Sequence, residues 1–170
     1  MVQNIKVEKH NPEYKVMFEQ EKEALLDILK DEAVQCFHIG WWFSCQTIID
    51  ILLVVKCVEN IDSYASAFES LNYEVMGEFG IPQRRYYRKG GLERTHQIHA
   101  FSYDNSNEII RHLAFRDYLA QHPNDCKEYG QLKQELAIKH PHDIDAYSEG
   151  KDKLVKSIEQ KALLWYWKTK

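Results

Sequence analysis

The sequence contains no apolar run long enough to cross a membrane. A membrane-spanning helix needs about 20 consecutive apolar residues, whereas the longest run here, residues 48–55, is interrupted by Asp50. Residues 1–9 also lack the apolar stretch that is typical of a secretory signal peptide. We therefore expect a cytoplasmic protein without a membrane partner.

Cysteine pairing motifs are absent as well. The chain has four cysteines, which are Cys36, Cys45, Cys57 and Cys126. They form no C-x-x-C pair, and no histidine lies nearby at the spacing of a zinc finger. In a reducing compartment we expect them to be free thiols, small and mostly buried.

A net positive charge is missing too. The chain has 22 lysine and arginine residues against 26 aspartate and glutamate residues, which gives a net charge of −4. This balance argues against non-specific binding of a nucleic acid by the whole surface, so no nucleic-acid partner is expected. A local basic patch is still compatible with it.

Internal repeats and low-complexity linkers are also absent. The chain has 170 residues, of which 44% are hydrophobic and 28% are charged. That length suits one ordinary domain and is short for two, and the composition is that of a globular protein with a core. We predict a single domain over residues 1–170.

Hydrophobic periodicity predicts a β-rich first part and a helical tail. Strands are expected at residues 5–9, 34–39, 48–55, 73–76 and in a hairpin over 84–89 and 94–101. Helices are expected over residues 12–31, 64–71, 107–120, 123–140 and 143–167. Residues 48–55 are β-branched and almost continuously apolar, which favours a central strand. The predicted fold class is α+β, a mixed sheet packed against helices, with the C-terminal helical segment closing over it.

Three stretches resemble signatures of the GrpB family, also called UPF0157. The first is His38-Ile39-Gly40 followed by residues 48–51, and the second is residues 84–87 with residues 95–99. The third runs over residues 112–119 and continues with His122-Pro123, Tyr129, Leu132-Lys133, Leu136-Ala137, Tyr147 and Lys151. Together they cover about residues 4–166. This resemblance implies a fold similar to that of the nucleotidyltransferases.

A nucleotidyltransferase site needs a small-residue turn that lets backbone N–H groups approach a triphosphate, and two carboxylates on one strand face that hold Mg²⁺. Gly40 and Asp50 match parts of this scheme, so the resemblance places both in the site and makes Asp50 the candidate metal ligand. Gly40 is followed by bulky aromatic residues, however, and Leu52 stands where the second carboxylate belongs. We therefore predict binding with little or no catalysis.

Asp50 and the aromatic residues after Gly40 each have two interpretations. Asp50 is either a site residue or the partner of a structural ion pair, because burying it alone would cost several kcal/mol. The run Trp41-Trp42-Phe43 either stacks on a flat ligand, or plugs the cleft or covers an oligomer contact. The second interpretation of this run is favoured, which leaves a homo-oligomer open.

The predicted hairpin carries a cluster of basic side chains. These are Arg84, Arg85, Arg88, Lys89 and Arg94. Strand alternation places Arg84, Tyr86 and Arg88 on one face and Arg85, Tyr87 and Lys89 on the other. Guanidinium groups there could bind phosphate or carboxylate, or they could form a solvated edge that discourages aggregation.

Two histidines on the second hairpin strand point to opposite faces. His99 shares a face with Gln97, whereas His96 shares the other with Ile98, so the two cannot bind one metal without a bulge. His99 could act as a general acid or base or as a phosphate donor, and either histidine could instead be structural.

On the predicted helices, Arg116 is the better ligand candidate. Asp117 is adjacent, so it should point elsewhere and pair with a basic group of the body. Lys133 and Lys151 match the resemblance, but helical lysines are usually solvated.

The sequence thus predicts a set of site residues for a nucleotide or another phosphorylated small molecule. The catalytic candidates are Asp50 and His99; the ligand-binding candidates are Gly40, Arg84, Arg85, His96 and Arg116. Two alternatives are an active metal-dependent nucleotidyltransferase, whose other carboxylates come from Glu74, Glu78 or Glu93, and an interaction module that uses the aromatic run.

Overall fold

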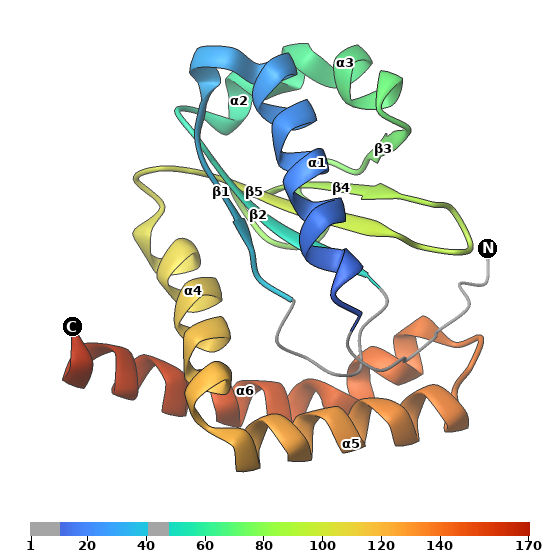
Figure 1. Ribbon diagram of the computed structural model, residues 1–170, viewed down its shortest axis with the longest axis vertical. Coiled ribbons are helices and arrows are strands. Elements are labelled where there is room, and N and C mark those ends of the chain that lie inside the picture. The colour runs from blue at the N-terminus through green and yellow to red at the C-terminus, as the bar shows by residue number, and fades with distance from the viewer. Residues whose placement is uncertain (1–10, 41–47) are drawn as a thin grey trace.

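The protein is built on one five-stranded sheet with helices on both faces (Figure 1). The computed structural model describes residues 11–40 and 48–170. The predicted strand 5–9 and the run Trp41-Trp42-Phe43 lie outside the described residues. Within the described parts of the chain, no helix is both long and apolar enough to span a bilayer.

The sheet has the strand order β1-β2-β5-β4-β3. The strands are β1 (Ala33–His38), β2 (Ile49–Val55), β3 (Tyr73–Val75), β4 (Arg85–Lys89) and β5 (His96–Ser102). β2 and β5 are parallel, and the other neighbours are antiparallel. The predicted strand 48–55 is therefore an interior strand, although β5 occupies the middle of the order. The predicted hairpin is confirmed as the β4–β5 pair.

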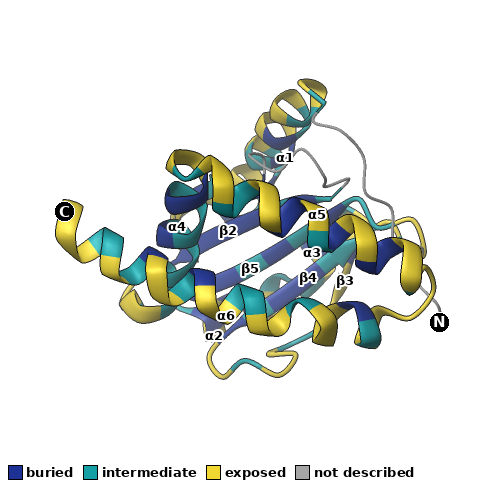
Figure 2. Cartoon of the chain, turned by 90° about the horizontal axis from the view of Figure 1, so that it is seen from below, coloured by how far each residue is buried: buried dark blue, intermediate teal, exposed yellow. Residues whose placement is uncertain are grey.

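The helices form two groups. The first group comprises α1 (Glu13–Leu29), η1 (Lys30–Glu32), α2 (Val58–Ile61), η2 (Asp62–Tyr64) and α3 (Ala65–Ser70). The second group comprises α4 (Ser106–Gln121), α5 (Pro123–Lys139) and α6 (Ile144–Thr169). The α+β class with a helical C-terminal segment is confirmed. Figure 2 shows α4, α5 and α6 on the near side of the sheet, while α1 lies apart from them at the top of the view.

Local chemistry sets where several helices begin. The Asn11 side chain accepts a hydrogen bond from the Glu13 N–H at 3.0 Å, and the Asp143 side chain accepts one from Ala146 at 3.0 Å, so both cap orphan donors of a first turn. Pro123 stands at the first position of α5, where its missing N–H costs nothing.

The helix predicted over residues 64–71 is wrong in its bounds. The chain already turns into a helix at Val58, and a 3₁₀ turn separates α2 from α3. The Ser63 hydroxyl donates to the Asn60 carbonyl at 2.8 Å. Short hydroxyl side chains that bond nearby carbonyls compete with the regular helical pattern, which explains the interruption.

The main core lies between the sheet and α1. Its fully buried members come from α1, α2, α3, β2 and β5, and include Leu25, Leu29, Ile51, Leu53, Val55, Ile61, Phe68, Ile98 and Ala100. The opposite face has a smaller apolar cluster, with Leu52, Val54 and Phe101 fully or almost fully buried under α4. Because this second cluster occupies only one end of β2, the other end is left to polar residues.

His38 at the end of β1 predicts a pH-dependent stability. Its ring stacks on Phe18 at a centroid distance of 4.8 Å, and burial lowers its pKa to about 4 from 6.5, against the opposing effect of Asp50. The imidazole of the unfolded chain titrates near 6.5. Its stabilising contribution is therefore complete above that pH and is lost as the pH falls toward 4.

When the pH falls from 7 to 5, we expect protonation of His38 to lower the free energy of unfolding by about 2 kcal/mol. Urea unfolding of the wild type and of His38→Phe, which keeps a ring against Phe18, measures the effect. The decline should be smaller in the variant by that amount, and an equal decline in both proteins would contradict the assignment.

Candidate functional site

The sheet face toward α4, α5 and α6 carries the polar residues that the sequence singled out. In the strand register, Tyr86 of β4 lies opposite His99 of β5, and His99 lies opposite Leu52 of β2. Asp50 precedes Leu52 by two positions and so shares its face. This surface, bearing Asp50, Tyr86 and His99, is called the polar face below. The predicted division of the hairpin side chains between two faces is confirmed.

Arg84, His99 and Asp50 form a chain of contacts on the polar face. The Arg84 Nη1 lies 3.3 Å from His99 Nδ1, and His99 Nε2 lies 3.9 Å from Asp50 Oδ1. Arginine can only donate hydrogen bonds, so the network assigns His99 Nδ1 as the acceptor. The ring proton of the neutral imidazole is therefore on Nε2, the atom that faces the Asp50 carboxylate.

Arg84 is a buried cation, with 7% of its surface exposed. Its Nε donates to the Glu78 carbonyl at 3.1 Å, and its Nη2 donates to the Phe79 carbonyl at 2.7 Å. No carboxylate among the described residues lies within ion-pair distance of it. Burial lowers its pKa, yet an arginine stays protonated at any physiological pH. The neutral groups around it engage three of its five N–H donors and bring no counter-charge.

The helices add two lysines to this region. Lys133 of α5 is 5% exposed, with its Nζ 5.0 Å from the centre of the Tyr129 ring. Lys151 of α6 has its Nζ 4.7 Å from the centre of the Tyr147 ring. Burial lowers the pKa of Lys151, and the Asp50 carboxylate acts in the opposite direction, as it must when the two charges face each other. The prediction that these lysines are solvated is wrong for Lys133, whereas Lys151 is half-buried.

Arg116 reaches the polar face from α4. Its guanidinium carbon lies 5.8 Å from the centre of the Phe37 ring, and its Nε donates to Asp117 Oδ1 at 2.7 Å. The expected pairing of Asp117 with another basic group is therefore wrong. Adjacent helical residues diverge at Cβ, but these two long side chains curl back far enough to meet.

His112 of α4 completes the surroundings of His99. The two rings are 5.4 Å apart, and His112 Nδ1 lies 2.7 Å from the Glu108 carbonyl, to which it donates. Burial lowers the pKa of His112 to about 3, so it is neutral at pH 7. Together with Tyr86, whose ring is 5.4 Å from that of His99, it fixes the orientation of the His99 ring.

Arg85 and His96, two of the predicted ligand residues, lie on the opposite face of the sheet. Arg85 makes a bidentate ion pair with Asp62, at 2.7 Å and 3.0 Å. His96 Nε2 lies 3.7 Å from Glu21 of α1, a carboxylate that also accepts from Lys89 at 2.9 Å. The structure thus uses both residues to tie helices to the sheet.

Gly40, in contrast, lies beside the polar face. It follows Ile39, whose N–H donates to the Asp50 carbonyl at 3.0 Å, and it is buried. The structure therefore brings together Gly40, Asp50, Arg84, His99 and Arg116, and separates them from Arg85 and His96.

The family is settled by sequence comparison. The model of the family described as "GrpB protein" matches residues 4–161. The chain belongs to the GrpB family. The resemblance found in the three signatures is thereby confirmed.

Two relatives and one solved structure show how far the likeness extends. The chain is 39% identical to UPF0157 protein YqkA of Bacillus subtilis, over 92% of this chain and 46% of that protein. It is 32% identical to UPF0157 protein PA4798 of Pseudomonas aeruginosa, over 90% of this chain and 65% of that protein. The crystal structure of conserved protein GrpB from Enterococcus faecalis superposes with a TM-score of 0.89 at 44% identity, covering 95% of this chain and 99% of that one. The chain thus spans about half of YqkA.

A magnesium site of the nucleotidyltransferase kind does not fit these residues. Among residues 11–40 and 48–170, no group of three or more His, Cys, Asp or Glu side chains could hold a metal ion. The second carboxylate position on β2 is Leu52, which is fully buried. Glu74 is engaged by Arg88 at 2.9 Å, and Glu78 accepts from the Gln83 N–H at 2.8 Å. Within the described parts of the chain, Asp50 therefore has no set of companion ligands for two-metal chemistry.

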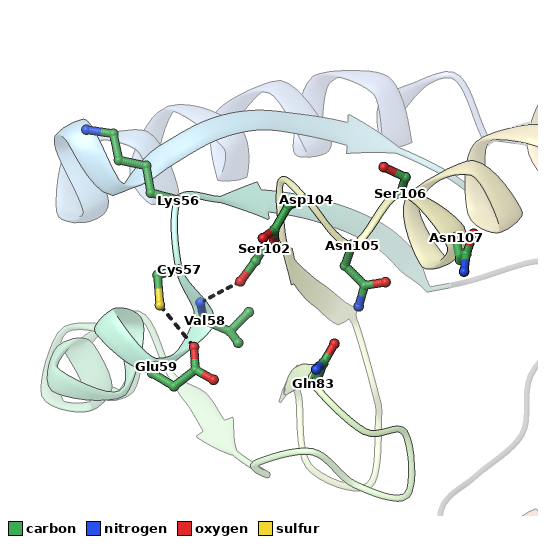
Figure 3. Close-up of a pocket in the computed structure, with 10 residues that line it drawn as sticks. All are labelled: Lys56, Cys57, Val58, Glu59, Gln83, Ser102, Asp104, Asn105, Ser106 and Asn107. Carbon is green, nitrogen blue, oxygen red and sulfur yellow. Dashed lines mark hydrogen bonds between the residues drawn. The ribbon is translucent and has the colours of Figure 1, made fainter.

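A hollow of about 420 Å³ lies elsewhere, at the carboxyl ends of β2 and β5 (Figure 3). Its lining is Lys56, Cys57, Val58, Glu59, Gln83, Ser102, Asp104, Asn105, Ser106 and Asn107. The Cys57 thiol donates to Glu59 at 2.9 Å, and the Val58 N–H donates to the Ser102 hydroxyl at 3.0 Å. Both acidic and basic groups line it, and none of the predicted site residues does.

The described cysteines differ in their burial. Cys57 and Cys126 are half-buried and form no disulfide, and only Cys36 of the described cysteines is fully buried.

The Arg84–His99 contact predicts the tautomer of His99. Long-range ¹H–¹⁵N correlation spectra at neutral pH should show His99 protonated at Nε2 and unprotonated at Nδ1, because Nδ1 accepts from Arg84. In Arg84→Met this preference should disappear while the rest of the histidine spectrum stays unchanged. A wild-type spectrum with the proton on Nδ1 would contradict the arrangement.

Proposed function

We propose that this chain binds a small molecule with a phosphate group, such as a nucleotide, on the polar face and does so with little or no catalysis. The observation that carries the proposal is the buried Arg84 guanidinium, whose partners are two main-chain carbonyls and an imidazole. A buried charge is stable when a counter-charge compensates it. A phosphate oxyanion supplies that counter-charge and matches guanidinium geometry.

Cations from several elements reinforce this site. Arg84 precedes β4, Arg116 comes from α4, and Lys133 and Lys151 come from α5 and α6. The chain as a whole has a net charge of −4, so a positive potential on this face is local rather than a property of the whole surface. Partial burial strengthens their attraction for an anion, because the local dielectric is lower than that of water.

Part of this region is in contact with solvent. The side chains of His99 and Asp50 are 17% and 19% exposed, and that of Arg116 is 21% exposed. These fractions are small enough to shield charge–charge interactions from full screening by the solvent.

The same geometry argues against catalysis by Asp50 and His99. A general base needs a free acceptor nitrogen, but His99 Nδ1 already accepts from Arg84. Metal-dependent transfer would need a second carboxylate, and Leu52 occupies that place. His99 therefore serves as a hydrogen-bond donor. The likeness to the nucleotidyltransferase fold stays a prediction from the family resemblance, and the proposal does not depend on it.

Isothermal titration calorimetry tests the proposal. Nucleotides and coenzyme A precursors should bind with dissociation constants of about 1 mM or lower at low salt, whereas their dephosphorylated counterparts should not bind. Affinity should fall as ionic strength rises, because exposed charges are screened. If no phosphorylated compound binds at millimolar concentration, the proposal is lost.

Substitution of Arg84 locates the site. Arg84→Gln should weaken the binding of the best phosphorylated ligand about tenfold or more, since a hydrogen bond to a charged group contributes about 1.5–3 kcal/mol. The matched control is Arg85→Gln, the same change on the opposite face, where the side chain is paired with Asp62; its affinity should be that of the wild type. Thermal unfolding of both variants establishes that they are folded. If the two variants bind alike, the anion does not bind at Arg84.

A further inference from the structure

We infer that the phosphorylated ligand carries a flat aromatic ring, such as a nucleobase, and that this ring stacks on the exposed side chain of Phe79. This inference rests on the proposed function and specifies the ligand class of the same site. Phe79 leaves 54% of its surface exposed. A single exposed apolar residue is common on protein surfaces, so the argument depends on how this one is held and on what lies beside it.

Phe79 is joined to both Arg84 and Tyr86. Its carbonyl oxygen accepts a hydrogen bond from Arg84 Nη2 at 2.7 Å. Its ring stacks on that of Tyr86, with the centroids 5.2 Å apart and the planes 18° from parallel. The guanidinium carbon of Arg84 lies 4.9 Å from the centre of the same Tyr86 ring. The exposed ring and the buried cation therefore adjoin one side chain of the polar face.

The backbone holds Phe79 in a strained conformation. Its φ is +47°, in the left-handed region that residues with bulky side chains rarely adopt. Contacts on either side fix the turn: Arg84 Nε donates to the Glu78 carbonyl at 3.1 Å, and the Gln83 N–H donates to the Glu78 side chain at 2.8 Å. Strained residues persist where the surrounding structure over-determines them, and they cluster at ligand sites. The fold thus presents an apolar ring to solvent from a fixed turn.

The contacts of the Phe79 ring favour a flat aromatic partner over an aliphatic one. Tyr86 is stacked on the ring, and the Arg88 guanidinium carbon lies 5.8 Å from its centre. A further flat ring can be added to this stack where Phe79 is exposed. Stacked aromatic rings attract each other beyond the effect of the buried area alone, and every nucleobase has a π-face that such a side chain can bind. An aliphatic phosphate ester has none.

The neighbouring cation makes the phosphorylated aromatic compound the matching ligand. A nucleotide carries its base and its phosphate on either side of one ribose, and the site offers an aromatic ring and a guanidinium on either side of Tyr86 contacts. Because stacking does not read the edges of a base, we expect purine and pyrimidine nucleotides both to bind.

Two probes separate the contribution of the base from that of the phosphate. Adenosine 5′-monophosphate and ribose 5-phosphate share the sugar and the phosphate, and only the first has a base. Calorimetric titration of the wild type at low salt should give an affinity for the nucleotide about tenfold higher than for the sugar phosphate. Equal affinities would overturn the inference, and so would a preference for ribose 5-phosphate.

Substitution of Phe79 locates the stacking. Phe79→Leu should bind adenosine 5′-monophosphate about tenfold more weakly and ribose 5-phosphate as the wild type does, whereas Phe79→Trp, which keeps a flat ring, should retain the preference. The control is Trp167→Leu, the loss of another exposed ring, 70% exposed on α6, which should change neither affinity. If Phe79→Leu weakens both ligands alike, the ring only supports Arg84, and the inference is overturned.

Failure of this inference differs from failure of the proposed function. If neither the nucleotide nor the sugar phosphate binds at millimolar concentration, both fail together. If the two bind with the same affinity and Phe79→Leu changes neither, phosphate binding stands and the aromatic ligand is excluded.

Discussion

The structure around the candidate site depends on one buried charge. The Arg84 guanidinium is buried, and its hydrogen-bond partners are neutral. They are the carbonyls of Glu78 and Phe79 and the imidazole of His99. These contacts engage three of its five N–H donors without cancelling its charge. They also fix the His99 tautomer and thereby direct a donor toward Asp50. Anion attraction and hydrogen-bond direction on the polar face both follow from this arrangement.

The cations on the two faces of the sheet differ in their ion-pair partners. Toward α1 and η2, Arg85 is paired with Asp62 and Lys89 with Glu21, at 2.7 Å and 2.9 Å. Those pairs connect helices to strands and leave no charge for a ligand. On the polar face Arg116 is also paired, with Asp117, but Arg84 has no acidic partner among the residues described. The hairpin thus carries structural arginine and candidate binding arginine at adjacent positions.

Much of this division could be predicted from the sequence. Period-two alternation separates Arg84 from Arg85 and His99 from His96 once the hairpin is recognised, and the register of β4 with β5 agrees with it. The apolar run of β2, broken by Asp50, likewise indicated an interior strand with a polar end. These features are local, so a single sequence contains them.

The remaining features depend on contacts between distant segments. Lys133 and Lys151 are spaced like ordinary solvated residues, and only tertiary contacts bury Lys133 and half-bury Lys151. The partner of Arg85 is 23 positions away in sequence, and no local pattern identifies it. Arg116 and Asp117 were assigned different directions because helical geometry fixes Cβ and not the end of a long side chain.

A crystal structure with a bound phosphate ester tests the central claim most directly. The account predicts phosphate density on the polar face, within hydrogen-bond distance of the Arg84 guanidinium. Phosphate found only in the hollow at the carboxyl ends of β2 and β5 would contradict it. A complex in which Arg84 makes no contact with the ligand would contradict it as well.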